Sequence, residues 1–415
     1  MNDKNSKDKN KREILLRRIH DKIDYSREME ETEIRRLIGE SLTEYGHESY
    51  LSLTEKEKLG KELFYAIRKL DILQEILEDE EITEIMINGP DNIFIEKEGR
   101  LFLWENRFSS REKLEDIIQQ ITAKCNRVVN EASPIVDARL EDGSRVNIVL
   151  SPIALNGPVM TIRRFPKDPI SMKRLIEIGS LPPQAAKWLR ILVQAGYNIM
   201  ISGGTGSGKT TFLNALSESI PKEDRIITIE DSAELQIQNA PNLVRMETRN
   251  ANAEGCREIT IRDLIRTSLR MRPTRLIVGE VRGGEAMDLL QCLNTGHDGS
   301  LSTGHANSAK DMLSRLETMA LMGLDLPIGA IRRQIASGID IVVHLGRLRD
   351  KTRKVLEIAE VLGMEGEEIR LETLCVFEET SGREEKEVKG KLVFKKELSN
   401  RQKLVAAGLP DLQPF

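Results

Sequence analysis

Cysteine is rare in this sequence. The 415 residues include only Cys125, Cys256, Cys292 and Cys375, and no two of them form a C-x-x-C pair. This spacing argues against a zinc knuckle and gives no support for a disulfide framework. Isolated thiols of this kind are typical of a protein that stays in the reducing cytosol.

Long apolar runs and a net positive charge are also missing. No run of about 18 apolar residues occurs, so we expect no membrane-spanning helix, and the polar opening "MNDKNSKDKNKRE" lacks the apolar core of a signal peptide. Aromatic residues make up only 4% of the chain, and its formal net charge is −5. Such a chain has no overall basic field to attract nucleic acid, although local basic patches remain compatible with it. We therefore predict a soluble, cytoplasmic protein.

Helical periodicity dominates the first part of the chain. Residues 1–12 contain almost nothing to bury and are expected to be disordered. From Ile14 to Leu77, apolar residues recur at three- and four-residue steps, as in "ETEIRRLIGESLTEY", which predicts helices. Residues 1–69 are therefore predicted to form a disordered and helical N-terminal extension.

After Asp79 the apolar residues begin to alternate with polar ones. "ITEIMING", "NIFIEKEG" and "RLFLWENRF" predict a strand meander, and "REKLEDIIQQITAKC" predicts a helix. "SPIVDARLEDGSRVNIVLSP" predicts a hairpin that turns at Glu141-Asp142-Gly143, and "GPVMTIRRF" adds another strand. Together these segments predict a small α+β sheet domain at residues 70–165.

A linker with two prolines, "PKDPISM", separates this domain from a different pattern. Helix and strand then alternate through "AAKWLRILVQAG", "NIMISG", "TFLNALSESI" and "RIITIED". This order predicts an α/β domain at residues 172–375, in which helices cover a parallel sheet. The charged tail after Glu365 is expected to be peripheral, with residues 376–415 forming a C-terminal extension.

The stretch "YNIMISGGTGSGKTTFLNALSESI" contains the motif G-x-x-x-x-G-K-[ST] between a predicted strand and a predicted helix. Glycines allow successive backbone N–H groups to turn toward phosphate oxygens, and the start of the helix adds positive potential. The lysine of the motif can reach the β- and γ-phosphates, and the following hydroxyl can bind Mg²⁺. We therefore predict a site for ATP and Mg²⁺. Its residues would be Gly203, Gly204, Thr205, Gly206, Ser207, Gly208, Lys209, Thr210 and Thr211.

Three further strand ends are predicted to meet this loop, since ligands of such sheets bind at the carboxyl ends of the strands. "RIITIED" ends in Glu230 and Asp231, "TRLIVGEV" places Glu280 after an apolar strand, and "LSTGHANS" brings His305. A carboxylate there can orient water or hold Mg²⁺ through water, whereas a surface acid at a strand end is the structural alternative. We interpret Glu280 and Glu230 as catalytic and Asp231 as a metal ligand together with Thr210. His305 is either a γ-phosphate sensor or a structural histidine.

Arginines form two further candidate groups. Arg139, Arg145, Arg163 and Arg164 lie in the predicted sheet domain, outside the phosphate loop. Arginines from a separate domain or subunit can stabilise charge that develops on phosphate, so these are catalytic candidates, with solvated strand arginines as the alternative. A stripe of arginines at four-residue spacing could face a neighbouring subunit, DNA or solvent. It consists of Arg262, Arg266 and Arg270.

The quoted segments resemble one family over roughly residues 70–375. They are similar to the secretion-superfamily traffic ATPases, most closely to the CpaF-like ATPases of tight-adherence (Flp) pilus systems. The resemblance is carried by "ITEIMINGPDNIFIEKEGRL", "DARLEDGSRVN", "GPVMTIRRF", "SGGTGSGKTT", "IEDSAELQ", "LRMRPTRLIVGEVRGGEA", "NTGHDGSLSTGHANS" and "SRLETMALM". The Walker A, aspartate-box, Walker B and histidine-box motifs of the family fall on Gly203–Thr210, Glu230/Asp231, Gly279–Glu280 and His305.

The resemblance implies a RecA-like ATPase domain after a smaller sheet domain, in a homo-hexamer whose active sites lie between domains. It also implies work at the cytoplasmic face of the inner membrane, with peripheral attachment through a membrane platform protein. Gly279 departs from the general Walker B form, in which an aspartate usually precedes the glutamate. Gly304 departs from the family pattern, in which a larger residue is expected before His305. The four-cysteine metal module of many type II secretion members is absent.

Two functions of different classes follow. The favoured hypothesis is a mechanoenzyme in which ATP hydrolysis drives pilin subunits through a membrane platform. The alternative is a nucleic-acid motor, such as a conjugative DNA-transfer ATPase, which the arginine stripe would suit. The charge of −5 and the few aromatic side chains argue against direct binding of nucleic acid.

Overall fold

The computed structural model divides the chain into two compact units, Met1–Lys167 and Asp168–Phe415. It describes residues 2–24, 26–27, 29–97, 99–125, 127–164, 169–249, 257–382 and 385–410, with the backbone alone for 2–10. Cys256 and residues 166–168 of the proline-rich linker lie outside the described residues. No helix among these residues is both long and apolar enough to cross a membrane.

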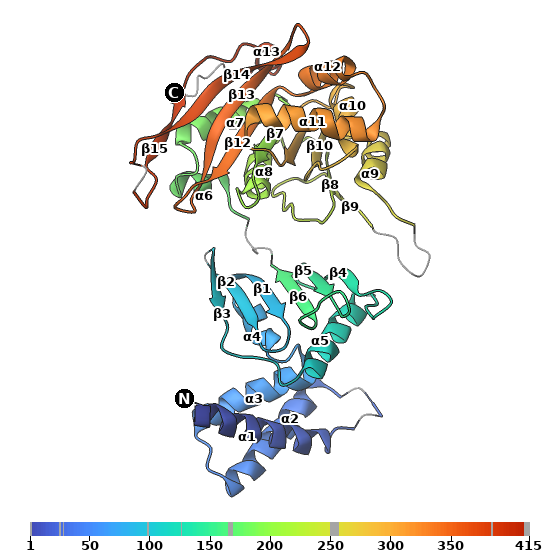
Figure 1. Cartoon of the computed structure of the whole chain (residues 1–415), viewed down its shortest axis with the longest axis vertical. Helices are drawn as coiled ribbons and strands as arrows, with labels where there is room; N and C mark the ends of the chain where they lie inside the picture. The colour runs from blue at the N-terminus through green and yellow to red at the C-terminus, as the bar shows by residue number, and fades with distance from the viewer. Residues whose placement is uncertain are drawn as a thin grey trace. The chain divides into compact units, whose positions relative to one another are not determined.

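The first unit begins with three helices that share a core of their own (Figure 1). They are α1 (Asn2–His20), α2 (Glu31–Glu48) and α3 (Leu53–Arg68). Leu15 and Ile19 of α1 are completely buried, together with Leu63 of α3. The expectation of disorder up to residue 12 is wrong, because α1 starts at Asn2. Once the buried turns of α1 are nucleated, a stretch without proline or glycine can propagate the helix at little cost.

A six-stranded antiparallel sheet completes the first unit, in the order β3-β2-β1-β6-β5-β4. Its strands are β1 (Ile82–Asn88), β2 (Ile93–Lys97), β3 (Arg100–Leu103), β4 (Ile135–Arg139), β5 (Arg145–Val149) and β6 (Val159–Arg163), with helices α4 (Leu73–Glu78) and α5 (Arg111–Lys124). The core lies on one face, where Ile85, Val146 and Ile162 pack with Ile118 of α5. The predicted meander and hairpin are present as β1–β3 and β4–β5.

The second unit is built on a nine-stranded mixed sheet, in the order β15-β14-β13-β12-β7-β11-β10-β8-β9. Six neighbouring strands run parallel to one another: β12, β7, β11, β10, β8 and β9. The other three, β13, β14 and β15, pair antiparallel at the β12 edge. The strands are β7 (Ile199–Gly203), β8 (Ile226–Glu230), β9 (Leu243–Glu247), β10 (Arg275–Val278), β11 (Leu301–Gly304), β12 (Ile341–Arg347), β13 (Arg353–Glu365), β14 (Glu368–Glu379) and β15 (Gly390–Phe394).

Helices cover both faces of this sheet, as the buried and apolar central strands require (Figure 1). One face carries α6 (Met172–Glu177), α7 (Pro183–Gln194) and α8 (Lys209–Ser217), and the other carries α9 (Ile261–Ser268), the 3₁₀ turn η1 (Leu269–Met271), α10 (Glu285–Leu293), α11 (Ala309–Gly323) and α12 (Ile328–Gly338). Trp188 of α7 lies in the first of the two cores. β7, β8, β10 and β11 run parallel, so their carboxyl ends meet at one edge of the sheet.

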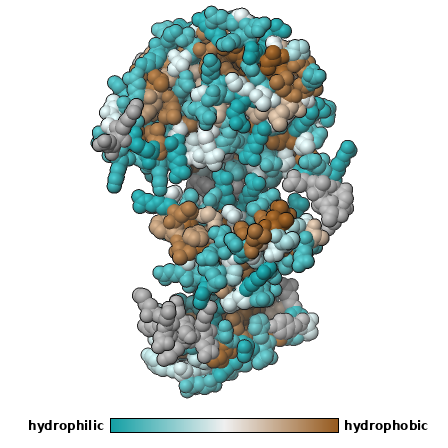
Figure 2. Space-filling model, viewed as in Figure 1, coloured by the Kyte–Doolittle hydropathy of each residue, from teal (hydrophilic) through white to brown (hydrophobic). Residues whose placement is uncertain are grey.

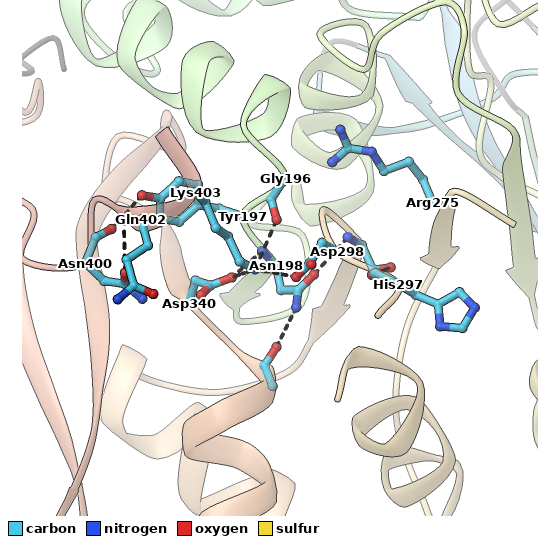
Figure 3. Close-up of polar contacts among 12 residues, drawn as sticks. Gly196, Tyr197, Asn198, Arg275, His297, Asp298, Asp340, Asn400, Gln402 and Lys403 are labelled. Carbon is cyan, nitrogen blue, oxygen red and sulfur yellow. Dashed lines mark hydrogen bonds and ion pairs between the residues drawn. The ribbon is translucent and has the colours of Figure 1, made fainter. Parts of the chain in front are cut away.

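The tail is part of the second unit, so the expectation of a peripheral extension is wrong. Strands β14 and β15 extend the sheet, and the short helix α13 (Gln402–Ala406) buries Leu404 in the core. Figure 3 shows Lys403 between Asp340 and Asp298, and its Nζ lies 2.7 Å from a carboxylate oxygen of each. Both oxygens of buried Glu360 accept backbone N–H groups of residues 399 and 400, at 2.8 and 2.7 Å. Glu360 accepts these bonds from the tail, whereas Asp340 also accepts the backbone N–H of Asn198 at 2.7 Å. The Glu360 bonds and the Lys403 ion pairs together keep the tail in place.

Candidate nucleotide-binding site

The glycine-rich loop leaves β7 and enters α8 at Lys209, as the motif predicts. Gly208 has a φ of 92°, a left-handed conformation that side chains rarely adopt. A Cβ at Gly203 would lie 2.5 Å from both the carbonyl oxygen of Leu345 and Ser207 Oγ, so no larger residue fits. Gly204, Thr205 and Gly206 are exposed, and the middle of the loop is therefore accessible to a ligand.

Lys209 is 92% buried behind this loop, with 8% of its surface exposed. Its Nζ donates to the carbonyl oxygens of Gly203 and Gly204, at 3.2 Å each. Burial lowers the pKa of Lys209, the nearby Glu280 carboxylate opposes this, and Arg282 adds to it. The ammonium group is thus held by weak backbone acceptors, which a phosphate group can replace with stronger charge-assisted bonds.

His305 connects Lys209 to Glu280. Lys209 Nζ lies 3.2 Å from His305 Nδ1, and His305 Nε2 lies 2.8 Å from Glu280 Oε1. An ammonium group can only donate, so Nδ1 accepts and the ring proton is on Nε2, where it faces the carboxylate. The pKa of His305 is lowered, mainly by burial, with Glu280 opposing and Lys209 adding to the effect. The contacts and the lowered pKa therefore both indicate a neutral imidazole between a cation and an anion.

Arg282 extends this chain on the far side of Glu280. Its Nη2 donates to Glu280 Oε2 at 2.7 Å, so each carboxylate oxygen has a separate neighbour. The side chain of Glu280 is 21% exposed, which leaves it in reach of water. We call Lys209, His305, Glu280 and Arg282 the polar chain. The sequence prediction included the first three but missed Arg282, two residues after Glu280 in "GEVRGGEA".

Glu230 is almost completely buried at the end of β8, with 3% of its surface exposed. Burial raises its pKa to about 7, although its Oε2 accepts hydrogen bonds from the backbone N–H groups of Glu234 and Leu235 at 2.7 and 2.8 Å. Among the described residues, its Oε1 has no hydrogen-bond partner. A Cβ at Gly279 would lie 3.0 Å from Glu230 Cγ, so the Glu230 side chain takes the space beside the position where an aspartate was expected.

The other predicted residues near the loop are less closely joined. Thr210 and Thr211 lie in the first turn of α8, both partly exposed. Asp231 accepts a hydrogen bond from Thr248 Oγ1 at 3.0 Å and lines a pocket with residues 258–262, away from the loop glycines. Within the described part of the chain, no cluster of three or more His, Cys, Asp or Glu side chains is arranged to hold a metal ion. A Cβ at Gly304 would lie 2.6 Å from Met312 Cε, the end of a flexible side chain, so a larger residue there would require Met312 to move.

The arginines of the first unit fall into two groups. Arg145 pairs with Arg139 on β4 and with Arg163 on β6, so these three lie on one face of the sheet, opposite the face that packs with α5. We call them the arginine row. Arg164 is different, because its Nη1 donates to the carbonyl oxygens of Asp79 and Ile82, the latter at 3.2 Å.

The arginine stripe, with Arg262 and Arg266 on α9 and Arg270 on η1, is largely neutralised within the second unit. Arg262 Nε and Arg266 Nε lie 2.7 and 2.9 Å from the two oxygens of buried Asp288 on α10. Arg270 donates to the carbonyl oxygen of Arg266 and to Thr267 Oγ1. The stripe therefore joins α9 to α10, and two of its three charges face a carboxylate rather than an open surface.

Comparisons with known proteins agree with this arrangement. A family model described as "Type II/IV secretion system protein" matches residues 67–398. The type IV secretion system protein PtlH of Bordetella pertussis is 34% identical over 318 residues, which cover 70% of this chain and 93% of PtlH. A Mycobacterium tuberculosis protein provisionally named as a conjugal transfer protein is 34% identical over 318 residues, covering 75% of this chain and 89% of that protein.

The fold also has relatives among solved structures. The pilus retraction motor PilT, solved with bound ADP, is 18% identical with a TM-score of 0.51, covering 82% of this chain and 86% of PilT. At this identity the likeness concerns the fold alone. It confirms the predicted fold class, an α/β RecA-like domain preceded by a smaller α+β sheet domain.

Proposed function

The chain belongs to the type II/IV secretion system family of ATPases, and on that premise we propose that it hydrolyses ATP at the glycine-rich loop to power transport across a membrane. The observation that carries this proposal is the polar chain. It connects the lysine of the loop, on α8, to the carboxylate after β10 through a histidine after β11. A loop that only bound phosphate would have no need of a carboxylate connected to its lysine in this way.

In the proposed mechanism, Lys209 exchanges its two carbonyl partners for the β- and γ-phosphate oxygens. Glu280 orients the attacking water and accepts its proton, and His305 Nε2 and Arg282 hold the carboxylate in place. Because His305 contacts both Lys209 and Glu280, movement of Lys209 toward phosphate changes the surroundings of the carboxylate. His305 would in this way report the presence of the γ-phosphate.

The residues present fit a magnesium ion on the nucleotide. The Thr210 hydroxyl lies in the first turn of α8, and Glu230 Oε1 is a buried oxygen without a protein donor among the described residues. We propose that these two groups hold Mg²⁺, directly or through water, in place of the expected Walker B aspartate. Asp231 fits this role less well because its carboxylate is bonded to Thr248. When bound there, Mg²⁺ would neutralise negative charge on the phosphates.

We further propose that the arginine row completes the site within a homo-hexamer. The row places three guanidinium groups side by side across adjacent strands, where Arg145 lies 4.0 Å from Asp137 and Arg163 lies 3.9 Å from Glu84. Ion pairs this long and partly exposed are weak, so a phosphate group can replace them with shorter charge-assisted bonds. Exposed apolar residues are available for assembly, since β3 at one edge of the sheet exposes Leu101, Phe102 and Leu103. Figure 2 shows such apolar patches on an otherwise hydrophilic surface.

The transported cargo is proposed from resemblance. The motifs resemble those of CpaF-like ATPases, so we propose pilus assembly at the cytoplasmic face of the inner membrane, through an integral platform protein. The relative named for conjugal transfer favours the second candidate, a motor for DNA transfer. The ion pairs of Arg262 and Arg266 with Asp288 argue against direct DNA binding by the stripe.

ATPase measurements on the purified full chain test both candidates. We expect hydrolysis that Lys209→Ala abolishes and that single-stranded DNA leaves unchanged at physiological salt. Light scattering should show a hexamer, and the tagged protein should retain one integral membrane protein whose purified form stimulates hydrolysis. Stimulation by single-stranded DNA, in the parent and not in Lys209→Ala, would favour the DNA-transfer candidate. No hydrolysis in the parent hexamer would contradict the proposal.

A further inference from the structure

Two arginines face each other beside the glycine-rich loop. Arg347 at the end of β12 pairs with Arg353 at the start of β13, so both side chains leave the same face of the hairpin. Both are exposed. Like charges directly opposite each other destabilise an antiparallel pair, so this arrangement weakens the hairpin unless an anion offsets it.

The described part of the chain supplies no such anion. None of its carboxylates lies within 4.0 Å of either guanidinium group. The one acid of the hairpin turn, Asp350, is engaged elsewhere, because its two oxygens accept from Thr352 and from the backbone N–H of Val388 at 2.9 Å. Arg349, also in the turn, bonds the carbonyl oxygens of Gly382 and Glu385. The hairpin is therefore fixed by its neighbours, while its two paired arginines keep their charges uncompensated.

Both arginines lie against the middle of the loop. Arg353 Nε donates to the carbonyl oxygen of Gly206 at 2.8 Å, the only hydrogen bond of this side chain among the described residues. A Cβ at Gly206 would lie 3.7 Å from Arg347 Nη1, and one at Gly208 would lie 3.3 Å from Arg353 Cδ. The Nη groups of Arg353 and the whole guanidinium of Arg347 thus remain available at the loop edge.

The sheet order fixes the side of the loop on which these charges lie. β7, which leads into the loop, has β11 and β10 on one side and β12 on the other. His305 and Glu280 follow β11 and β10, so the γ-phosphate end belongs to that side. A nucleotide that starts there and crosses the loop brings its α-phosphate and ribose toward the hairpin.

We propose that Arg347 and Arg353 bind the part of the nucleotide that ATP and ADP share, at the α-phosphate and ribose. This assignment rests on the proposed nucleotide site and adds two binding residues to it. The contacts are made equally by substrate and product, so they contribute uniform binding and not transition-state stabilisation. The alternative is a purely structural role, in which Arg353 only braces the loop through Gly206.

Nucleotide titrations of the full chain separate these roles. The probes are ADP and a non-hydrolysable ATP analogue, and the variants are Arg347→Ala, Arg353→Ala and Arg353→Lys. Each alanine variant should bind both nucleotides about tenfold or more weakly, since a hydrogen bond to a charged group is worth about 1.5–3 kcal/mol. The factor should be the same for the two nucleotides, with KM raised and kcat unchanged. Arg353→Lys should recover part of the affinity.

Lys351→Ala is the matched control, because it removes one charge from the tip of the same hairpin, and it should leave both affinities unchanged. The proposal is overturned if ADP affinity stays at the parent level in both alanine variants, or if only the ATP analogue is affected. A lower melting temperature without ligand, together with parent ADP affinity, overturns it in favour of the structural brace. Lys209→Ala, titrated in parallel, must lose binding. If it does not, the nucleotide site itself is misplaced, a failure distinct from that of the arginines.

Discussion

The pKa of Glu230 should make the stability of the second unit depend on pH. Burial raises this pKa from 4.5 to about 7, while the unfolded chain keeps the ordinary value. Below pH 4.5 the carboxyl is protonated in both states. Between pH 4.5 and 7 only the folded state keeps the proton, so the free energy of unfolding falls as the pH rises. A pKa difference of about 2.5 corresponds to a decrease of about 3 kcal/mol in the free energy of unfolding. Most of this decrease occurs as the pH rises from 4.5 to 7.

The substitution Glu230→Gln removes this titration and should flatten the pH profile by that amount. Trp188 is buried in the second unit and Trp104 is the only other tryptophan, so in a Trp104→Phe background fluorescence reports unfolding of the second unit alone. Urea unfolding at pH 5 to 8, without nucleotide, gives the free energy at each pH. Glu223→Gln, which changes an exposed carboxylate before β8, should retain the parent profile. Parent and Glu230→Gln profiles of equal slope would refute the reasoning.

Three further predictions concern the site. Lys209→Ala should lose nucleotide binding because the loop loses its lysine cation, and an unchanged affinity in an ATP titration would contradict the site. Glu280→Gln should bind ATP and turn over about 10²–10⁴ times more slowly, so steady-state hydrolysis within twofold of the parent would exclude a catalytic role. Alanine at any member of the arginine row should lower turnover without lowering ATP affinity, while Arg164→Ala should instead lower the melting temperature of the first unit. Equal effects of all four arginine variants on turnover, in assemblies that light scattering shows to be intact, would contradict the distinction between the arginine row and Arg164.

Periodicity made much of the fold predictable, because burial on one side dictates the spacing of apolar residues. The alternation from Ile82 to Arg163 predicts the meander and hairpin, and the apolar run before Gly203 predicts β7. The tail was misjudged because its strands carry many charges and its anchors are polar. Glu360 and Asp340 meet the tail only in the folded chain, and nothing in the local sequence pairs an acid with a lysine 63 residues away.

The site was predictable where a motif fixes its own geometry. The loop glycines and Lys209 belong to one short segment, and the rule for parallel strand ends brings Glu280 and His305 to the same edge. Sequence reasoning did not separate Arg164 from the arginine row, since that requires knowing which strand face each residue takes. It also missed Arg353, because an arginine in a hairpin is normally a solvated residue, and only the sheet order places this one against Gly206.

Lys209 on one side of the loop, and Arg347 and Arg353 on the other, differ in the part of the nucleotide to which they respond. Lys209 is joined through a neutral imidazole to Glu280, so a change at the γ-phosphate alters the contacts of the carboxylate after β10. Arg347 and Arg353 lie on the other side of β7 and have no such connection to an acid among the described residues. Loss of the γ-phosphate therefore affects the first group and leaves the second in contact with ADP. The contacts of Lys209, His305 and Glu280 would then change during a hydrolysis cycle, while Arg347 and Arg353 keep the nucleotide bound. A motor that couples hydrolysis to movement requires such a combination.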